Sequence, residues 1–178
     1  NRIGGIMITI DGGTGIIMRN GVEMASEKMV DEWRVHTSKE HGSGVVAVTE
    51  YWERNDNNFA LIGKSMTESS GVFSFPITGI FLIRAQINFY TNGGARAYLG
   101  CIIEGTYDNS TYVDIGGNYA SSSGTNYYNG VSATCVFDVT DTSTHKVRLK
   151  TNFPGTATVQ GSSNYQRTAI HFTRLGST

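Results

Sequence analysis

The sequence predicts an all-β fold made of antiparallel strands. From about residue 45 onward, short segments rich in Val, Ile, Phe, Tyr and Thr are separated by clusters of Gly, Asn, Asp and Ser, which is the pattern of strands joined by turns. The chain has only two prolines, Pro76 and Pro154. Both lie at the ends of proposed strands, where a missing N–H breaks no hydrogen-bond ladder. Segment lengths and turn positions therefore agree on a β sandwich.

Eight or nine strands follow from this pattern. The segment "HKVRLKTNF" alternates with a period of two and places Val147, Leu149 and Phe153 on one face. Its other face carries Lys146, Arg148 and Lys150, and we expect that face to be solvated. The expected strands are 45–52, 59–62, 71–75, 79–90, 95–104, 111–120, 130–139, 145–153 and 167–175.

The strand expected over 79–90 has two apolar faces at its start. One face suits the inside of a sandwich and consists of Phe81, Ile83, Ala85, Ile87 and Phe89. The other begins with Ile80 and Leu82 and then turns polar, and Ile102 on the next strand repeats the signal. Burying ~300 Å² of apolar surface per subunit is worth about 7 kcal/mol before association costs. We therefore expect Ile80, Leu82 and Ile102 at a subunit interface, with a helix or loop from residues 1–44 as the alternative cover.

Composition excludes several partners. The 178 residues hold 14 Lys and Arg against 15 Asp and Glu, a formal charge of -1, so no basic surface points to nucleic acid. No apolar run approaches the roughly 20 residues of a membrane span, and we expect no membrane insertion. The length suits one sizeable domain with an appended arm.

Two cysteines, Cys101 and Cys135, lie in mid-strand beside apolar neighbours. Small buried hydrophobes are the favoured interpretation, because free Cys is among the most buried residue types. A disulfide between facing strands is the alternative. Neither cysteine has the clustered Cys or His partners of a metal site, and we expect no metal and no cofactor.

Residues 1–44 differ from the rest of the chain and are expected to form a mixed attachment arm or the top of a shaft, before a head over 45–178. "GGIMITIDGGTGIIMRNG" indicates a hairpin or strands added to a neighbour, and its glycines lack the spacing of a phosphate loop. "SEKMVDEWRVH" predicts a short helix capped by Ser26, because Met29, Trp33 and His36 recur at spacings of four and three.

Catalysis is not expected. The four histidines are scattered along the chain, and none has the spacing of a nucleophile or metal site. Asp108 and Asp114 flank an expected loop, which leaves open a sugar-cleaving carboxylate pair or a calcium site. We predict a protein that is not an enzyme.

Residues 105–130 are dense in Tyr, Asn, Ser and Gly. Such residues combine rigid contact area with adaptable hydrogen bonding and are typical of recognition loops, including those that bind glycans. The alternative is ordinary use of Asn, Ser and Gly in turns and of Tyr on strands. The candidate receptor-binding residues are Tyr119, Asn126, Tyr127, Tyr128, Asn129 and, further along, Tyr165.

Two segments resemble a known superfamily. "FSFPITGIFLIRAQINFY" and the closing "RTAIHFTRLG" are similar to strands of the complement globular-head and tumour-necrosis-factor superfamily, over roughly residues 45–178. The resemblance implies a ten-strand jelly roll that assembles as a homotrimer. By match of position, the core and corner residues would be Phe73, Phe75, Gly79, Phe81 and Phe172.

The chain departs from the secreted animal members of that superfamily. We expect no collagen-like run, anchor or leader before the head, and this expectation favours versions resembling bacteriophage fibre and virion-surface heads. The expected function is thus a trimeric head on the virion surface, attached to other virion proteins by its arm and binding a host glycan or envelope receptor. Capsid decoration that stabilises the particle is the alternative, and a secreted lectin-like or signalling head ranks below both.

Overall fold

The computed structural model describes residues 8–11, 16–19, 22–25, 27–57 and 61–178. Within these residues all regular structure is β-strand. No helix able to cross a membrane occurs among them. The strands are β1 (Ile8–Asp11), β2 (Ile16–Arg19), β3 (Val22–Ala25), β4 (Val30–Val35), β5 (Lys39–His41), β6 (Gly44–Ala47), β7 (Trp52–Arg54), β8 (Leu61–Ile62), β9 (Thr67–Ser69), β10 (Val72–Ser74), β11 (Gly79–Thr91), β12 (Arg96–Thr106), β13 (Tyr112–Ser122), β14 (Tyr127–Val139), β15 (Lys146–Phe153), β16 (Ala157–Val159) and β17 (Ala169–Gly176).

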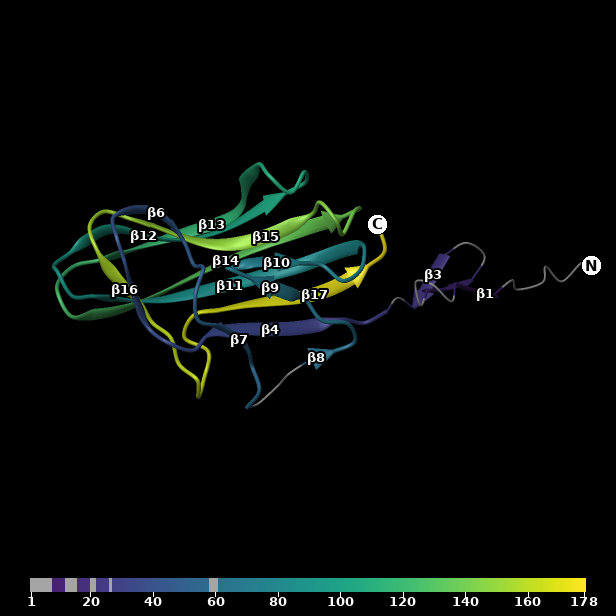
Figure 1. Cartoon of the computed structure of the whole chain (residues 1–178), viewed down its shortest axis with the longest axis horizontal. Coiled ribbons are helices and arrows are strands. Elements are labelled where there is room, and N and C mark those ends of the chain that lie inside the picture. Colours follow the sequence, from purple (N-terminus) through teal and green to yellow (C-terminus); the bar gives the residue numbers. More distant parts are fainter. Residues whose placement is uncertain (1–7, 12–15, 20–21, 26, 58–60) are drawn as a thin grey trace, which may run out of the picture.

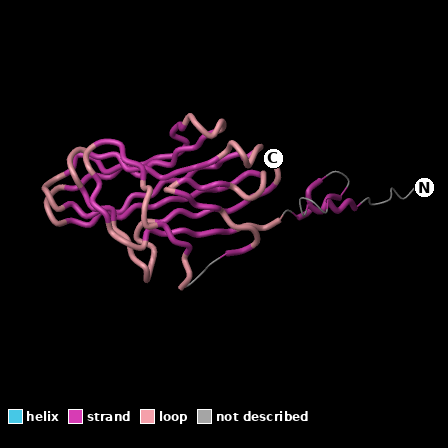
Figure 2. The backbone as a smooth tube through the Cα atoms, in the orientation of Figure 1, coloured by secondary structure: helices cyan, strands magenta, loops and turns pink. Residues whose placement is uncertain are grey.

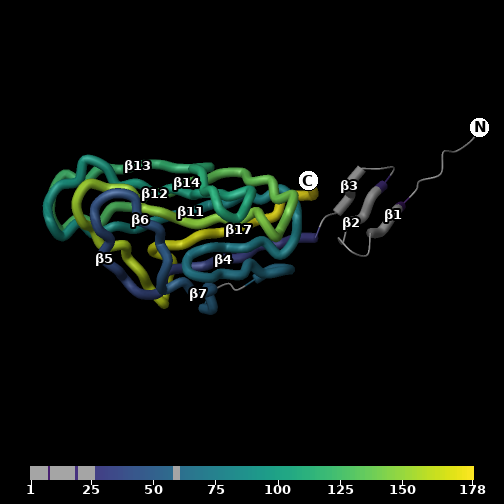
Figure 3. Tube along the Cα trace, turned by 45° about the horizontal axis from the view of Figure 1, so that its top comes forward, coloured from purple at the N-terminus to yellow at the C-terminus, as the bar shows by residue number. Residues whose placement is uncertain are grey.

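Two antiparallel sheets form the head, and they lie as two layers in Figures 1 and 3. The first has the strand order β13-β12-β15-β10-β9, with β6 also paired to β15. The second has the order β5-β16-β11-β17-β4-β7, with β14 paired to β11 and β8 to β4. The predicted all-β antiparallel sandwich is confirmed.

The core lies between the two layers and contains the residues that the period-two pattern placed there. The inward side chains of β11, from Phe81 to Phe89, are at most 2% exposed. Phe75 packs on Phe81 with ring centroids 4.7 Å apart. Cys101 and Cys135 are both buried as free thiols, and burial raises the pKa of Cys101 to about 12 and that of Cys135 to about 11. The prediction of two buried small hydrophobes is confirmed.

The predicted helix over residues 26–36 is wrong, because residues 30–35 form β4. This strand pairs with β17 in the register Ile170 to Trp33, and Trp33 packs edge-on against Phe73 at 5.7 Å. Asp31 is also buried, and its carboxylate accepts hydrogen bonds from Arg54 and from the backbone N–H of Met66. Those bonds offset the desolvation of the charge. Residues 30–41 thus belong to head sheets, although the sequence placed them in the arm.

The remaining N-terminal strands pair with one another. β1 pairs with β2 and β2 with β3, all antiparallel, so the hairpin interpretation is confirmed for the described part of this segment. The central glycines of that hairpin and the expected cap at Ser26 lie outside the described residues.

The head has two ends, which Figure 2 shows as loops at either tip of the strands. The end that holds the loops 75–78, 107–111 and 140–145 together with the C-terminus is here called the terminal end. The distal end holds the loops 92–95, 123–126 and 154–156. Strand register fixes this arrangement, because Thr91 pairs with Tyr127 at one end and Gly79 with Val139 at the other. Residues leading into β4 enter at the terminal end, where the N–H of Arg174 bonds to the carbonyl of Met29.

Candidate functional site

The outward side chains of β14, β11, β17 and β4 form one broad surface, which we call the open face. Its rows follow from the pairing register: Leu82 lies opposite Val136 on one side and Thr173 on the other. Arg84 lies opposite Thr134 and His171 in the next row. The chain itself covers part of this surface, because the outward residues Arg34 on β4 and Ala169 on β17 are at most 1% exposed, but the rows nearer the terminal end are uncovered.

The half of the open face nearest the terminal end is apolar. Val136 is 61% exposed and Leu175 is 54% exposed. Ile80 and Leu82 lie beside them on β11 and are half-buried. Exposed aliphatic residues are common singly, but a contiguous group marks an interaction surface. The predicted second apolar face of β11 therefore exists, and Val136 and Leu175 extend it.

The middle of the open face is charged. Glu32 lies at its centre and accepts hydrogen bonds from Asn55 at 3.1 Å and Gln166 at 2.5 Å. The Nδ1 atom of His171 lies 2.9 Å from the same carboxylate. Arg84 is exposed and forms no ion pair with the described residues. This band therefore combines a satisfied carboxylate with a cation that is available to a partner.

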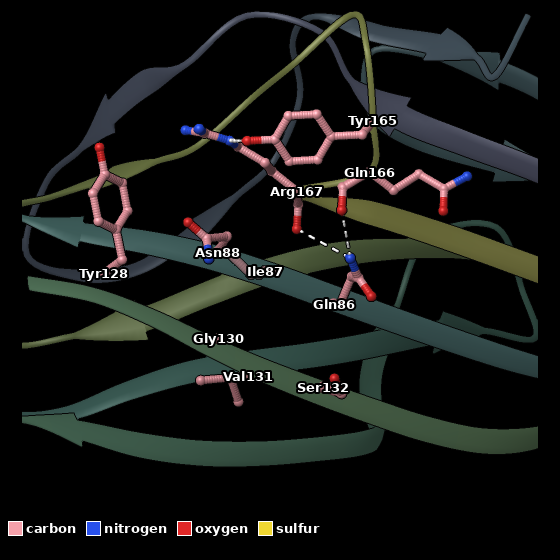
Figure 4. Close-up of a pocket in the computed structure, with 10 residues that line it drawn as sticks. All are labelled: Gln86, Ile87, Asn88, Tyr128, Gly130, Val131, Ser132, Tyr165, Gln166 and Arg167. Carbon is pink, nitrogen blue, oxygen red and sulfur yellow. Dashed lines mark hydrogen bonds between the residues drawn. The ribbon is translucent and has the colours of Figure 1, made fainter. Parts of the chain in front are cut away.

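An aromatic hollow lies on the distal half of the open face (Figure 4). It is an open cavity of about 470 Å³. Arg167 lies between two rings, with its guanidinium carbon 5.8 Å from the Tyr128 ring centre and 5.2 Å from that of Tyr165. Its Nε donates to the Tyr165 hydroxyl at 2.7 Å. The lining residues are Gln86, Ile87, Asn88, Tyr128, Gly130, Val131, Ser132, Tyr165, Gln166 and Arg167.

A second hollow continues this cavity toward the terminal end. It measures about 360 Å³ and shares Gln86, Ser132 and Gln166 with the first. Gln86 lies at the junction, where its side-chain amide Nε2 donates a hydrogen bond to the backbone carbonyl of Gln166 at 2.8 Å. The two hollows are therefore neighbours along the open face, with Gln86, Ser132 and Gln166 lining both.

The opposite surface, made by the outward side chains of β13, β12, β15 and β6, is here called the closed face. Ile102 lies there between Gly117 and Lys150 on the neighbouring strands and is only 3% exposed. The single chain already covers it, so the expectation that a neighbouring subunit buries Ile102 is corrected. Its outward position was predicted, but its covering by adjacent strands was not.

Charges on the closed face neutralise one another. Glu104 accepts from Arg148 at 2.6 Å and from Lys150 at 2.9 Å, and Lys150 also reaches Asp114 at 2.5 Å. Burial lowers the pKa of Lys150, but the hydrogen bonds to Asp114 and Glu104 outweigh burial and raise the pKa overall. The expectation that this face of "HKVRLKTNF" is solvated fails at Lys150, which is 9% exposed.

The predicted receptor-binding residues fall in three places instead of one. Tyr119 lies in the middle of β13 on the closed face, because most of 105–130 is strand and not loop. Tyr128 and Tyr165 line the hollow of the open face. The distal end holds the remaining three, Asn126, Tyr127 and Asn129. These residues were grouped because most of them lie in one Tyr- and Asn-rich segment of the sequence, but the fold places them on different surfaces.

Several residues of the open face were missed. Arg167 and Gln86 belong to no sequence motif that would mark them as site residues, because a single Arg or Gln is usual on a strand. Val136 and Leu175 had a signal: period two from Ala133 and Cys135 places Val136 on the outward side of β14. That periodicity finds outward apolar residues but not the polar ones beside them.

The two carboxylates of the proposed pair, Asp108 and Asp114, are each engaged by a different part of the chain. The carboxylate of Asp108 accepts the backbone N–H groups of Thr111 and Ser110, and these bonds lower its pKa. Asp114 instead forms an ion pair with Lys150. Among the described residues, no group of three His, Cys, Asp or Glu side chains is placed to hold a metal ion.

Comparison with known proteins settles the fold. No family model matches the chain, and no curated protein matches it. Its structure is similar to that of murine APRIL, with a TM-score of 0.61 at 16% identity over 83% of this chain and 99% of that one. It is also similar to Eiger TNF from S. frugiperda, with a TM-score of 0.63 at 10% identity over 85% and 95% of the two chains.

The fold is a TNF-like jelly roll. At these identities the likeness shows the fold alone, and it confirms the jelly-roll part of the sequence resemblance.

Proposed function

We propose that this chain is the head of a homotrimer and that the open face forms the contact between subunits. The observation that carries the proposal is the apolar group Ile80, Leu82, Val136 and Leu175, of which Val136 and Leu175 are more than half exposed in the single chain. Burial of such a group stabilises an oligomer by about 25 cal/mol per Å² before association costs.

The polar part of the open face is consistent with a ring of three subunits. A head-to-tail contact places different surfaces of one chain against each other and closes when the rotation is a third of a turn. Arg84 and Asp138 are both exposed on this face and carry opposite charges. In this arrangement Tyr128 and Tyr165 belong to the subunit contact, whereas the sequence had suggested a receptor site for them.

We further propose that the trimer is a non-enzymatic binding head on a virion surface, such as the tip of a bacteriophage fibre. Support comes from the sequence resemblance to viral heads and from the N-terminal strands β1–β3, which pair only with one another in the described sheets. A separate small sheet before the head suits an attachment segment that joins other virion proteins.

A matched pair of substitutions tests the trimer. Val136 on the open face and Val45 on the closed face are both strand valines, exposed by 61% and 60%. The Val136→Asp variant should sediment as a monomer with an intact fold, because a buried unpaired charge opposes association by several kcal/mol. The Val45→Asp variant should sediment as the wild type does, at three times the chain mass.

Leu82→Asp gives a second measurement on the same face, and it should also abolish the trimer. A wild-type chain that stays monomeric at micromolar concentration contradicts the proposal, as does a Val136→Asp variant that remains trimeric. Gold-labelled antibody against the head should decorate intact virions made from the encoding genome. Label confined to host cells would contradict the virion placement and leave the trimer standing.

A further inference from the structure

The closed face presents an aromatic corner on the layer opposite the open face. Tyr98 on β12 and Tyr119 on β13 lie with ring centroids 6.1 Å apart and an interplanar angle of 77°. Tyr119 is 51% exposed and Tyr98 is 39% exposed. In this edge-to-face arrangement the edge of one ring meets a face of the other, so the two rings meet as the two sides of a corner. One ring can therefore act as a floor and the other as a wall.

Gly100 leaves the space in which the Tyr119 ring, the floor of the corner, lies. It is the cross-strand partner of Tyr119, and a Cβ atom added at position 100 would lie 2.6 Å from Cε1 and 3.1 Å from Cδ1 of that ring. The Tyr119 ring thus rests over the glycine backbone, in space that any other residue would fill. One side of the ring therefore lies against the sheet, while the residue as a whole keeps 51% of its surface exposed.

Asn152 supplies a polar group at the edge of the same ring. It pairs with Gly100 from the other side on β15, so Tyr119, Gly100 and Asn152 form one row across three strands. The Nδ2 of Asn152 donates to the Tyr119 hydroxyl at 3.4 Å. The Tyr119 hydroxyl accepts there and retains its own proton for donation to a ligand, and the amide oxygen of Asn152 is a further acceptor.

The neighbouring charges do not select an ionic ligand. Two cations, Arg148 and Lys150, are paired with two carboxylates, Glu104 and Asp114, beside the aromatic corner. Their formal charges cancel, and their hydrogen bonds are directed at one another. The surface next to Tyr119 therefore offers an aromatic face and neutral hydrogen-bonding groups without a local field.

We propose that Tyr98, Tyr119 and Asn152 form a binding platform for a neutral saccharide. The C–H face of a pyranose packs on the open ring of Tyr119, Tyr98 borders it, and the Tyr119 hydroxyl and Asn152 amide bond to sugar hydroxyls. The platform names a ligand class for the binding head proposed above. It does not need the trimer, because it is built within one chain on the layer away from the open face.

Calorimetric titration with three neutral probes, the hexasaccharides chitohexaose, maltohexaose and cellohexaose, tests the platform on the full chain. At least one should bind the wild type. Tyr119→Leu keeps an apolar cover over Gly100 but removes the ring, and it should weaken that binding at least about tenfold. Gly100→Ala should do the same while both tyrosines remain, because its Cβ displaces the ring.

Tyr107→Leu is the matched control. Tyr107 is 54% exposed and lies in the loop 107–111 at the terminal end, where its ring packs on Phe137 with centroids 5.2 Å apart; this variant should bind as the wild type does. The platform is overturned if none of the probes binds, if Tyr119→Leu binds unchanged, or if oligogalacturonate displaces the neutral probe at lower concentration. It is also overturned if Tyr119→Leu reduces the oligomer size, which identifies a second copy as the occupant.

Sedimentation of the same variants separates this proposal from the trimer. A trimeric wild type that binds no probe overturns the platform alone. A monomeric wild type that binds a probe through Tyr119 overturns the trimer alone.

Discussion

The two outer faces of the sandwich differ in how their outward side chains are partnered. On the closed face, outward side chains satisfy one another: Glu104 pairs with Arg148 and Lys150, and Ile102 is covered by its own sheet. On the open face, Val136 and Leu175 stay exposed and Arg84 has no ion-pair partner among the described residues. The charged part of the closed face therefore completes its contacts within the chain, whereas Val136, Leu175 and Arg84 on the open face leave contacts to be made.

Removal of a charge should show the largest difference between the faces. In a Val136→Asp background, which the trimer proposal expects to be monomeric, Glu104→Ala should lower the free energy of unfolding by about 3 kcal/mol, because it leaves Lys150 buried with a single partner. Arg84→Ala on the open face should change it by less than about 0.5 kcal/mol. Urea denaturation of the three proteins measures both values. Equal losses would mean that the closed face is no better satisfied than the open one.

The thiols sharpen the comparison between the two sheets. Cys101 lies in the closed-face sheet and is fully buried, whereas Cys135 lies on β14 in the open-face sheet and is 9% exposed. Burial raises the pKa of both, to about 12 and about 11, so both are thiols at neutral pH. Mass spectrometry after timed alkylation should show slow labelling of both, with Cys135 modified first. Rapid labelling of Cys101 in the native protein would contradict its burial.

The smallest expected effect concerns His41, at the edge where β5 and β6 join the two layers. Burial, followed by the charge of Lys39, lowers its pKa below the usual 6.5, and Glu50 opposes this shift. The folded protein therefore binds this proton less readily than the unfolded chain. Its contribution to stability is complete above about pH 6.5 and is lost as the pH falls toward the folded pKa.

His41→Gln removes that titration, so the drop in melting temperature from about pH 8 to about pH 5 should be smaller in this variant than in the wild type. The other three histidines, His36, His145 and His171, are common to both proteins and cancel in the comparison. An identical drop in the two proteins would show that His41 is not the group responsible.

The strands of the head were predictable because burial imposes a strict period of two. The inward residues of β11 follow it without exception, and so do Leu99, Cys101 and Ile103 on β12. The helix predicted around Trp33 failed because a spacing of four, as between Met29 and Trp33, also keeps two residues on the same side of a strand, whereas His36 lies just beyond the end of β4. A buried aspartate at Asp31 hid the alternation.

The candidate site was predictable only in part. Periodicity identified Leu82 as outward and apolar, but it cannot show whether neighbouring side chains cover an outward residue. For that reason Ile102, which its own chain covers, was wrongly assigned to a subunit interface. Composition marked Tyr119 and Tyr128 together, although β13 and β14 carry them to opposite layers. The row Tyr119, Gly100 and Asn152 joins three strands far apart in the chain. Only strand pairing reveals such a row.

Chain entry and exit lie on the same side of the head. The segment before β4 and the end of β17 both lie at the terminal end, as Figure 1 shows. The turn at Gly93 and Gly94 lies at the other end, and a Cβ at Gly94 would meet nothing closer than 3.8 Å. A peptide epitope grafted between these glycines would therefore project away from whatever carries the head, which makes the protein a natural display scaffold with one anchored pole and one editable pole.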